Sequence, residues 1–534
     1  MPNLLLEIRC EDLPASVLPK ILEQLSEITH AYFAQERIAF EDIKVYGTLR
    51  RIALHMKNVS SRQSDDVREI RGPVVSEAFF SNSIPTSATE GFAKDVGVEI
   101  NNLRIKEYDS EEYIVALIKK ESKNTIDILP ELLPKIISEI KTHNDIRWGS
   151  GDFRFVRPLR SIVALFGNEV INFTLGDITS GNITRGNRFL APYKAVITFA
   201  DNYMDVMEEN MIIVDQEKRR DIIHWQLNMF ARRDGATVVD DHNNALHEMV
   251  NRVEYPTALL GSFNSEYLKL PQSLLYHIIC NEQHHFLLIK DGKIIPKFIS
   301  VRDGDLSYIS VVREGYERVL NAKLADANFF YQQDCKRELQ ELIDGLNWLR
   351  FKDIGGNMRD KTDRHERLAL KLSELLNKNL EEIEIIKRAA LLSFVDLSTG
   401  MVLEHPSLRG IIGKEFLKNL GEPDEITTAI GEQYFPNYEN GNLPLTEIGR
   451  ILSICVKIDD LCLSLFDKHE NYSRQIIIDD AVSALCRFID ASDLTLEMVL
   501  ILVEYTLLML SEEDVKTRES IVMNIKEIFK KRCV

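Results

Sequence analysis

The chain has 534 residues, of which 45% are hydrophobic and 28% are charged. This length predicts two to four domains, and this composition is typical of a globular protein with hydrophobic cores. The formal net charge of −18 at pH 7 excludes a uniformly basic nucleic-acid-binding protein, because the average field repels polyanions. Any nucleic-acid-binding function therefore needs arginines that are clustered locally.

Neither a membrane span nor a signal peptide is predicted. No run of 18 apolar residues occurs, and the first residues lack the basic segment of a signal peptide. The predicted compartment is the cytoplasm. The seven cysteines are scattered, odd in number and free of any C-x-x-C pair, which favours reduced thiols over a disulfide framework or a zinc ribbon.

Roughly the first 300 residues predict a mixture of helices and antiparallel strands. Residues 4–8 read as a strand, and a helix is expected to begin near Leu13-Pro14 and to carry its apolar residues at helical spacing as far as Tyr32. Glycine-containing turns at Gly167-Asn168 and Asp291-Gly292 predict tight hairpins. The remaining predicted elements are strands at 43–46, 51–56 and 113–118 and a short helix at 87–96. This pattern indicates an α+β fold rather than a doubly wound sheet.

From about Glu338 the pattern becomes helical. Leucines fall on one face near 368–376, apolar residues continue that pattern over 383–390, and a last helix follows Val515. The predicted organisation is an α+β region over 1–337 with two or more subdomains, a helical domain over 338–470, and a short helical tail over 471–534.

The stretch from Arg147 to Arg160 contains four arginines, one tryptophan and two phenylalanines. Guanidinium groups bind phosphate oxygens and stack on planar rings, and aromatic faces accept unstacked bases. The stretch is therefore a candidate nucleic-acid site. An alternative interpretation is a strand whose aromatic side chains belong to the core and whose arginines are solvated. The adjacent Arg50 and Arg51 lie at a predicted turn, where both are expected to be exposed.

Other candidate sites are weak. Gly355 to Thr362 resembles a phosphate-binding loop, but Asp360 replaces its second glycine and would repel phosphate. The cluster His277, Cys280, His284 and His285 has spacing that suits a metal-binding helix face, although an apolar structural helix is favoured. His365, Asp396, His405 and Asp459 are reminiscent of metal phosphohydrolases, but Val395 replaces the histidine of the His-Asp pair.

A set of motifs, in order along residues 1 to 470, resembles the beta subunit of bacterial heterotetrameric glycyl-tRNA synthetase. The motifs are Leu6-Glu7-Ile8, Glu11-Asp12-Leu13-Pro14, Leu49-Arg50-Arg51-Ile52-Ala53, Arg71-Gly72-Pro73, Gly91-Phe92-Ala93, Arg147-Trp148-Gly149, Phe155-Val156-Arg157-Pro158, Arg185-Gly186-Asn187-Arg188-Phe189, Leu324-Ala325-Asp326-Ala327, Asp360-Lys361-Thr362-Asp363-Arg364 and Asp396-Leu397 with Met401 to Glu404.

This resemblance implies a tRNA-binding subunit of a glycine-tRNA ligase. In the family, the alpha subunit makes glycyl-adenylate from glycine and ATP with Mg²⁺, and the beta subunit binds tRNA(Gly) within an α2β2 assembly. The resemblance implies no catalytic residue, metal or cofactor in this chain. It also implies a degenerate HD-type helical domain, with His365, Asp396 and Asp459 at HD-type positions, and a helical anticodon-binding domain.

The sequence departs from the family pattern in several places. Asn321 and Lys323 stand where arginines are usual, Asn187 replaces a histidine, and Val456 replaces an aspartate. Only about sixty residues follow position 470, which predicts a contracted anticodon-binding region. An alternative function is a structural scaffold for the alpha dimer with little tRNA recognition. The tRNA-binding candidates are Arg50, Arg51, Arg71, Arg147, Trp148, Arg154, Phe155, Arg157, Arg185, Arg188 and Lys323. For each arginine, an internal salt bridge or a contact to a backbone carbonyl is the alternative role.

Overall fold

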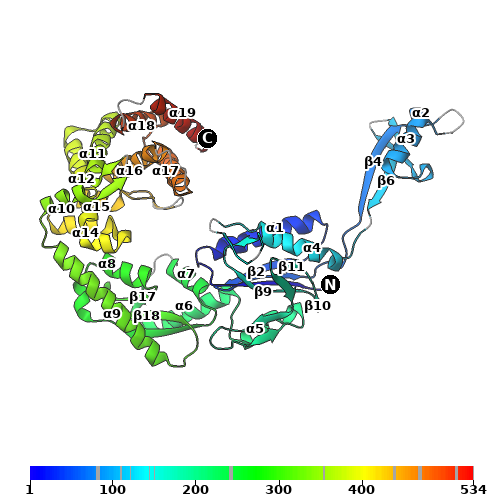
Figure 1. Cartoon of the computed structure of the whole chain (residues 1–534), viewed down its shortest axis with the longest axis horizontal. Coiled ribbons are helices and arrows are strands. Elements are labelled where there is room, and N and C mark those ends of the chain that lie inside the picture. The colour runs from blue at the N-terminus through cyan, green and yellow to red at the C-terminus, as the bar shows by residue number, and fades with distance from the viewer. Residues whose placement is uncertain are drawn as a thin grey trace. The chain divides into compact units, whose positions relative to one another are not determined.

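The structure is a computed structural model that describes residues 1–79, 85–108, 111–120, 122–142, 145–149, 151–239, 244–352, 355–436, 441–466, 472–510 and 515–532. The chain forms two compact units (Figure 1). Unit 1 comprises residues 1–260 and 299–313, and unit 2 comprises residues 261–298 and 314–534. None of the described helices combines the length and apolar character that a membrane-spanning segment needs.

The main sheet of unit 1 is predominantly antiparallel, with strand order β11-β12-β9-β1-β3-β2. Its central strand β1 pairs with β3 on one side and β9 on the other, so that Leu6 lies opposite Leu54 and Ala164. Strand β12 is parallel to β9, and β10 pairs with β9 through the predicted turn. The strands are β1 (Leu4–Cys10), β2 (Asp42–Thr48), β3 (Arg51–Lys57), β9 (Leu159–Phe166), β10 (Glu169–Val170), β11 (Thr174–Leu175) and β12 (Ile178–Gly181).

Both faces of this sheet are covered, which explains why the successive residues Leu4, Leu5 and Leu6 of β1 are all apolar. Leu4, Leu6 and Ile8 face α1 (Leu18–Gln35) and α4 (Thr125–Glu139), whereas Leu5 faces the segment containing α5 (Tyr203–Glu209) (Figure 1). Helix α1 begins at Leu18 and not near Pro14 as predicted, because residues 14–17 form a separate turn in which the Val17 N–H donates to the Pro14 carbonyl. Pro19, in the first turn, is the proline that suits this helix start.

Unit 1 contains a second, three-stranded sheet of order β4-β6-β5. The predicted strand at 113–118 lies within β6, and the predicted helix at 87–96 is α3. The elements not yet given are β4 (Asp66–Val74), α2 (Val75–Ala78), α3 (Ser87–Val96), β5 (Arg104–Tyr108), β6 (Glu111–Lys120), β7 (Ile146–Arg147), β8 (Arg154–Phe155), β13 (Ile183–Arg185), β14 (Lys194–Val196), α6 (Gln216–Arg233), β15 (Thr237–Val238), α7 (Asn244–Arg252) and β16 (Pro256–Ser262).

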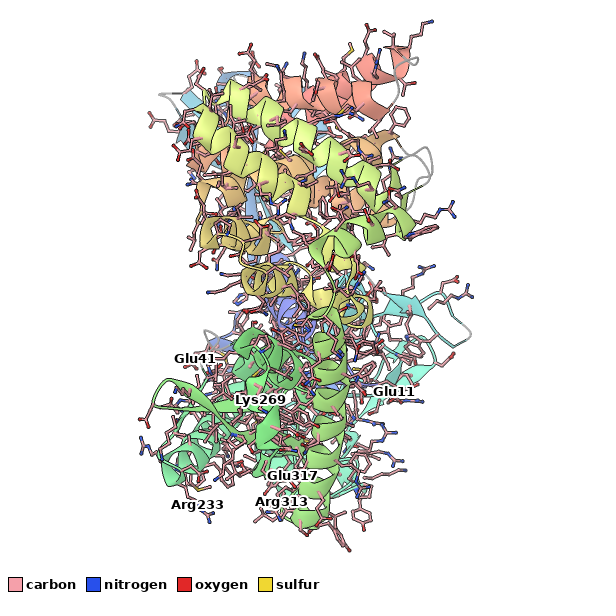
Figure 2. All side chains as sticks on the ribbon, turned by 90° about the vertical axis from the view of Figure 1, so that its left-hand side faces the viewer. Glu11, Glu41, Arg233, Lys269, Arg313 and Glu317 are labelled. Atoms are coloured by element: carbon pink, nitrogen blue, oxygen red, sulfur yellow. The ribbon has the colours of Figure 1, made fainter. Side chains whose placement is uncertain are left out.

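The chain crosses between the units within β16, within β18 (Lys293–Asp303) and within the long helix α9 (Ile309–Asp334). The predicted hairpin at Asp291-Gly292 joins β17 (Phe286–Lys290) to β18, and both turn residues adopt positive φ angles, as a tight hairpin turn requires. In unit 2, Glu317 of α9 accepts hydrogen bonds from the backbone N–H and the hydroxyl of Ser262. Figure 2 shows Glu317 on this helix.

The rest of unit 2 is largely helical, as predicted for this part of the chain. One hydrophobic core joins residues from Leu342 to Phe529, so the helices after position 471 share a core with those before it. The elements are α8 (Gln272–Tyr276), α10 (Leu339–Gly345), β19 (Arg350–Lys352), β20 (Gly356–Asn357), α11 (Met358–Leu375), α12 (Leu380–Leu392), α13 (Gly400–Glu404), α14 (Ile411–Asn419), α15 (Asp424–Glu432), α16 (Glu447–Phe466), α17 (Tyr472–Ala491), α18 (Leu496–Leu510) and α19 (Val515–Arg532).

The predicted fold class, α+β with antiparallel sheets followed by a helical region, is confirmed. The expectation of reduced thiols holds for Cys10, Cys280, Cys335, Cys455 and Cys462, which are free. It is wrong for Cys486, which is disulfide-bonded. This cysteine lies in α17, a helix that packs against α19.

Candidate nucleic-acid interface

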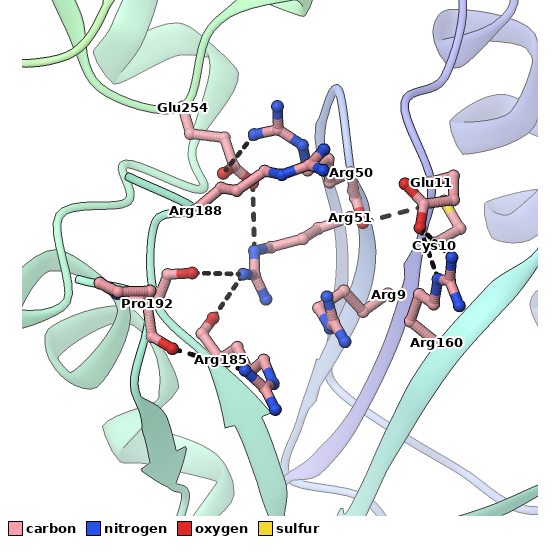
Figure 3. A pocket seen from close by; sticks show the side chains of 11 residues that line it. Arg9, Cys10, Glu11, Arg50, Arg51, Arg160, Arg185, Arg188, Pro192 and Glu254 are labelled. Carbon is pink, nitrogen blue, oxygen red and sulfur yellow. Dashed lines mark hydrogen bonds and ion pairs between the residues drawn. The ribbon is translucent and has the colours of Figure 1, made fainter. Parts of the chain in front are cut away.

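An arginine-lined pocket of about 330 Å³ lies in unit 1, beside strands β1, β3 and β13 (Figure 3). Six arginines line it, against only two carboxylates. Four of these arginines are predicted site residues, and they come from two segments that lie far apart in the sequence. The lining residues are Arg9, Cys10, Glu11, Arg50, Arg51, Arg160, Arg185, Gly186, Arg188, Pro192 and Glu254.

Arg51 lies inside the protein and not at the surface, so the expectation that it is exposed is wrong. Only 2% of the residue is accessible. Its Nη1 donates to Thr184 Oγ1 at 2.9 Å, and it forms ion pairs with Glu7 (3.3 Å) and Glu254 (3.2 Å). Burial opposes the charge, but the two carboxylates outweigh it and raise the pKa of Arg51. Arg51 is buried because it is the first residue of β3, and β3 lies between two other strands of the sheet.

Arg50 is also largely enclosed, contrary to the prediction, with 11% of its side chain accessible. Its Nε donates to Asp12 at 2.6 Å, and its Nη1 lies 3.4 Å from Glu254 and 3.6 Å from Asp303. Burial and Glu254 raise the pKa of Asp303. Arg50 thus holds a cluster of carboxylates together, and its guanidinium is already committed within the protein.

Arg9 and Arg160 line the same pocket, although neither was predicted as a contact residue. Arg9 donates from Nε to Ser161 Oγ at 3.1 Å, and Arg160 forms an ion pair with Glu11 at 2.5 Å. Burial and the nearby Arg51, together with Arg185 and Arg160, lower the pKa of Arg9. The arginines therefore repel one another, and a bound anion would relieve that repulsion. Side chains alternate between the two faces of strand β1, so Arg9 lies on the same face as Glu7. This alternation could have predicted from the sequence that the two side chains share a face.

Arg185 and Arg188 are exposed, as is Arg160, but Arg160 is already paired with Glu11. Arg185 Nη1 lies 3.5 Å from the Pro192 carbonyl, at the limit of hydrogen bonding. Among the described residues, no hydrogen bond or ion pair engages the Arg188 side chain, whose guanidinium extends across the pocket (Figure 3). These two side chains have donors available for phosphate oxygens.

The loop that carries Arg188 has a defined shape. A Cβ atom at Gly186 would lie 2.3 Å from the Ala191 carbonyl oxygen, so only glycine fits there. Asn187 is completely buried, and its Oδ1 accepts hydrogen bonds from the N–H groups of Phe189 (3.0 Å) and Leu190 (3.1 Å). The asparagine that replaces the family's histidine therefore fixes the backbone of the loop.

Two aromatic rings near this loop are open to solvent. Phe189 and Tyr193 are each 72% exposed, and they flank the pocket residue Pro192 and the exposed Arg188. Exposed rings beside arginines can accept unstacked bases, whereas buried rings cannot. Neither residue is among the predicted contact residues. Phe189 was part of a family motif only, and the exposure of both rings depends on the fold.

The predicted aromatic pair Trp148 and Phe155 does not form such a surface. Phe155 is 1% exposed and belongs to the core of unit 1. Trp148 is partly buried, packs edge-on against Phe153 with ring centroids 6.1 Å apart, and keeps its indole N–H buried without a partner. Of the two predicted alternatives, stacking on bases or supporting the arginines, the burial of Phe155 fits only the supporting role.

The other arginines of the 147–160 stretch lie outside the pocket lining. Arg147 donates from Nε to the Gly151 carbonyl at 2.9 Å and pairs with Asp152, while Arg154 lies opposite it in the β7–β8 pair and is exposed. Arg157 donates to the carbonyls of Asp12 (3.0 Å) and Val156 (2.9 Å). Arg157 thus adopts the predicted alternative role of an arginine that binds backbone carbonyls.

Two further candidates belong to other parts of the fold. Arg71 of β4 stacks over the Tyr113 ring, with its guanidinium carbon 3.3 Å from the ring centroid. Lys323 lies on α9 in unit 2. The neighbouring Asn321 accepts a hydrogen bond from the Asn264 N–H at 2.8 Å and donates to the Glu317 carbonyl.

The predicted HD-type positions lie in the helical part of unit 2 and do not converge on a common point. His365 is buried, neither ring nitrogen has a partner, and burial lowers its pKa to about 3. Asp396 accepts a hydrogen bond from the Gly410 N–H at 2.6 Å, and burial raises its pKa to about 6. Asp459 pairs with Arg364 at 2.9 Å. Within the described residues, no group of three or more metal-ligating side chains is placed to hold a metal.

The remaining weak motifs have structural roles. Asn357 and Asp360 cap helix α11 reciprocally, at 2.9 Å and 2.8 Å, which accounts for the aspartate in the loop that resembled a phosphate site. His277 and Cys280 lie on a π-helical turn (His277–Glu282) that ends before His284, so the histidine cluster does not share a helix face. His285 stacks on Phe298 at 4.7 Å, and burial lowers its pKa to about 4.

Comparisons with known proteins decide the family. The family model for the glycyl-tRNA synthetase beta subunit matches residues 4–471. The chain belongs to the glycyl-tRNA synthetase beta subunit family. It is 38% identical over 460 residues to the glycine–tRNA ligase beta subunit of Halothermothrix orenii, 36% over 460 to that of Moorella thermoacetica, and 39% over 458 to that of Clostridioides difficile. Each alignment covers 86% of this chain and 66% of the relative.

The family resemblance predicted from the motifs is thus confirmed. The match with the family model includes the pocket and most of the helical region, and it ends where α17 begins. The chain aligns with slightly less than two thirds of the length of these relatives.

Proposed function

We propose that this chain is the tRNA-binding beta subunit of a glycine–tRNA ligase. In this proposal it binds tRNA(Gly) in the cytoplasm and positions it for charging by an alpha subunit, in an α2β2 assembly. The alpha subunit activates glycine with ATP and Mg²⁺, and this chain contributes no catalytic residue, metal or cofactor. Support comes from the names of its relatives, each a glycine–tRNA ligase beta subunit.

The observation that carries the proposal is the pocket with its exposed loop. Arg185 and Arg188 bind backbone phosphates, and Phe189 and Tyr193 stack on bases that have left a helix. Arg9 and Arg160 complete the positive wall, while Arg50 and Arg51 hold the carboxylates beneath it. Because the whole chain has a charge of −18 at pH 7, we expect the salt dependence of binding to reflect only these few contacts.

We also propose the domain division predicted from the sequence. Residues 1–337 bind tRNA, residues 338–470 form a degenerate HD-type domain around His365, Asp396 and Asp459, and residues 471–534 are a contracted anticodon-binding region. The ion pair between Asp459 and Arg364 supports the degenerate assignment, because the arginine occupies one side of a potential metal ligand. Charging of a tRNA(Gly) with a changed anticodon tests the contraction: equal charging of both tRNAs supports it.

The test of the main proposal is aminoacylation by this chain mixed with its cognate alpha subunit. We expect Arg188→Ala and Phe189→Ala each to raise the KM for tRNA by about tenfold, because each removes a contact of about 1–3 kcal/mol. Arg220→Ala is the matched control, since Arg220 is a partly exposed arginine of unit 1 that pairs with Glu217 outside the pocket. Unchanged KM values for both pocket variants would refute the proposal.

A second function, a scaffold for the alpha dimer with little tRNA recognition, is favoured by one observation. Arg51, Arg157 and Asn321 use their donors within the protein. If the isolated chain binds tRNA(Gly) no better than an unrelated RNA at every salt concentration, while the alpha dimer requires it for stability, this function replaces the first.

A further inference from the structure

A second cavity, of about 630 Å³, lies within the helical part of unit 2. Its volume falls in the range of small-molecule binding sites. Its walls come from β19, the start of α11, the segments before α14 and after α15, and the middle of α16 and α17. None of the proposed tRNA-binding residues lines this cavity, so an occupant would have a function separate from the arginine-lined pocket of unit 1.

The charged groups of the cavity include two cations with unused donors. Lys457 donates to the Pro436 carbonyl at 3.1 Å, and Arg409 lies with its guanidinium carbon 4.8 Å from the Tyr434 ring centroid. Among the described residues, neither side chain forms an ion pair within 4 Å. An ammonium group carries three donors and a guanidinium five. Both side chains can therefore hold oxygens of an anion.

The third cation, Lys361, is already engaged. Its Nζ lies 2.7 Å from Asp460 and 3.6 Å from Asp459, and it sits 4.2 Å from the centroid of the Phe351 ring. The lining thus contains three cations and the two carboxylates Asp460 and Asp480, which leaves one net positive charge. This balance matches a monoanion or a monophosphate better than a triphosphate, which would leave several charges without a partner.

Aromatic side chains form a large part of the wall. Phe351, Phe394, Tyr434 and Phe435 all line the cavity, and Phe394 and Tyr434 come from segments on either side of α14 and α15. The Tyr434 hydroxyl is buried and has no hydrogen-bond partner. A buried hydroxyl without a partner costs about 1–3 kcal/mol, and a polar group of a ligand that reached it would remove this cost.

We propose that this cavity binds a ribonucleoside monophosphate. Arg409 and Lys457 hold the phosphate, Asp480 accepts hydrogen bonds from the ribose hydroxyls, and the base packs against the aromatic wall beside Tyr434. The aromatic rings suit a planar base, the carboxylate suits the hydroxyl donors of a sugar, and the two cations with unused donors suit a single phosphate. The loop at Gly355 takes no part as a phosphate cradle, because Asp360 caps it.

The test is isothermal titration of the full-length chain with AMP, GMP, CMP and UMP, followed by the nucleoside of the best ligand and by inorganic phosphate. We expect at least one nucleotide to bind with one-to-one stoichiometry, and both fragments to bind at least about tenfold more weakly, because each lacks half of the contacts. Arg409→Ala and Lys457→Gln should each weaken nucleotide binding by about tenfold or more.

Two control variants locate the binding. Arg388→Ala removes an arginine of the same unit that pairs with Glu422, and Arg188→Ala removes the free arginine of the unit 1 pocket. Both should bind the nucleotide as the unmodified chain does. The proposal is overturned if no nucleotide binds at about 5 mM, if inorganic phosphate binds as tightly as the nucleotide, or if Arg188→Ala abolishes binding while the cavity variants do not.

Discussion

Replacing the buried Arg51 by methionine should strongly destabilise unit 1, whereas removing the exposed Arg188 should not. Arg51→Met keeps an unbranched apolar stem but deletes the guanidinium that bridges Glu7 and Glu254, both of which are completely buried. Removing one partner of a buried ion pair costs about 3–5 kcal/mol, because the other charge stays buried without compensation. Thr184 also loses its donor at 2.9 Å. Arg188→Ala deletes no described hydrogen bond and should change stability by less than about 0.5 kcal/mol.

The assay is urea unfolding followed by circular dichroism, with hydrogen exchange of peptides from β1 and β3 to assign the transition to unit 1. The double variant Arg51→Met, Glu7→Gln should recover part of the loss, because it removes the carboxylate whose described ion pair is the one with Arg51, whereas Glu254 keeps its ion pair with Arg50. A loss of less than about 1 kcal/mol for Arg51→Met would refute the conclusion that this arginine is a structural residue. Equal losses for Arg51→Met and Arg188→Ala would refute the separation of structural from binding arginines.

Three further predictions follow from other sites. Gly186→Ala should raise the KM for tRNA and lower stability by about 1–3 kcal/mol, since its Cβ would lie 2.3 Å from the Ala191 carbonyl oxygen. Steady-state charging measures the KM and urea unfolding measures the stability. If neither quantity changes, the loop does not require glycine at this position. Burial raises the pKa of Asp396 to about 6 from 3.8, so the folded state holds a proton that the unfolded state releases, and stability should fall by about 2 kcal/mol as pH rises from 4 to 6. Asp396→Asn should flatten this dependence in urea unfolding at pH 4, 5, 6 and 7, and an unchanged slope would exclude Asp396 as its source. His365→Leu should be neutral or stabilising by about 1–2 kcal/mol, because both ring nitrogens are buried without partners. A loss of stability above about 2 kcal/mol in urea unfolding would mean that the imidazole has a partner.

Local patterns in the sequence were sufficient for several of the elements. The predicted helix at 87–96 and the hairpin at Asp291-Gly292 agree with α3 and with the β17–β18 pair, because apolar spacing and glycine turns act within a few residues. The start of α1 was predicted too early, since a proline suits a turn as well as a first helical position, and Pro14 lies in the turn.

The sequence by itself determined the family, the α+β class and the presence of an arginine cluster. Those properties depend on residue identity and on local order along the chain. Only the tertiary structure decided which arginines are free. Arg51 and Arg188 look alike as exposed candidates, but Arg51 meets Glu7 and Glu254, which lie 44 and 203 residues away in the sequence. Burial and pairing depend on contacts across such separations, and for that reason Phe155 belongs to the core while Phe189 remains exposed beside the pocket.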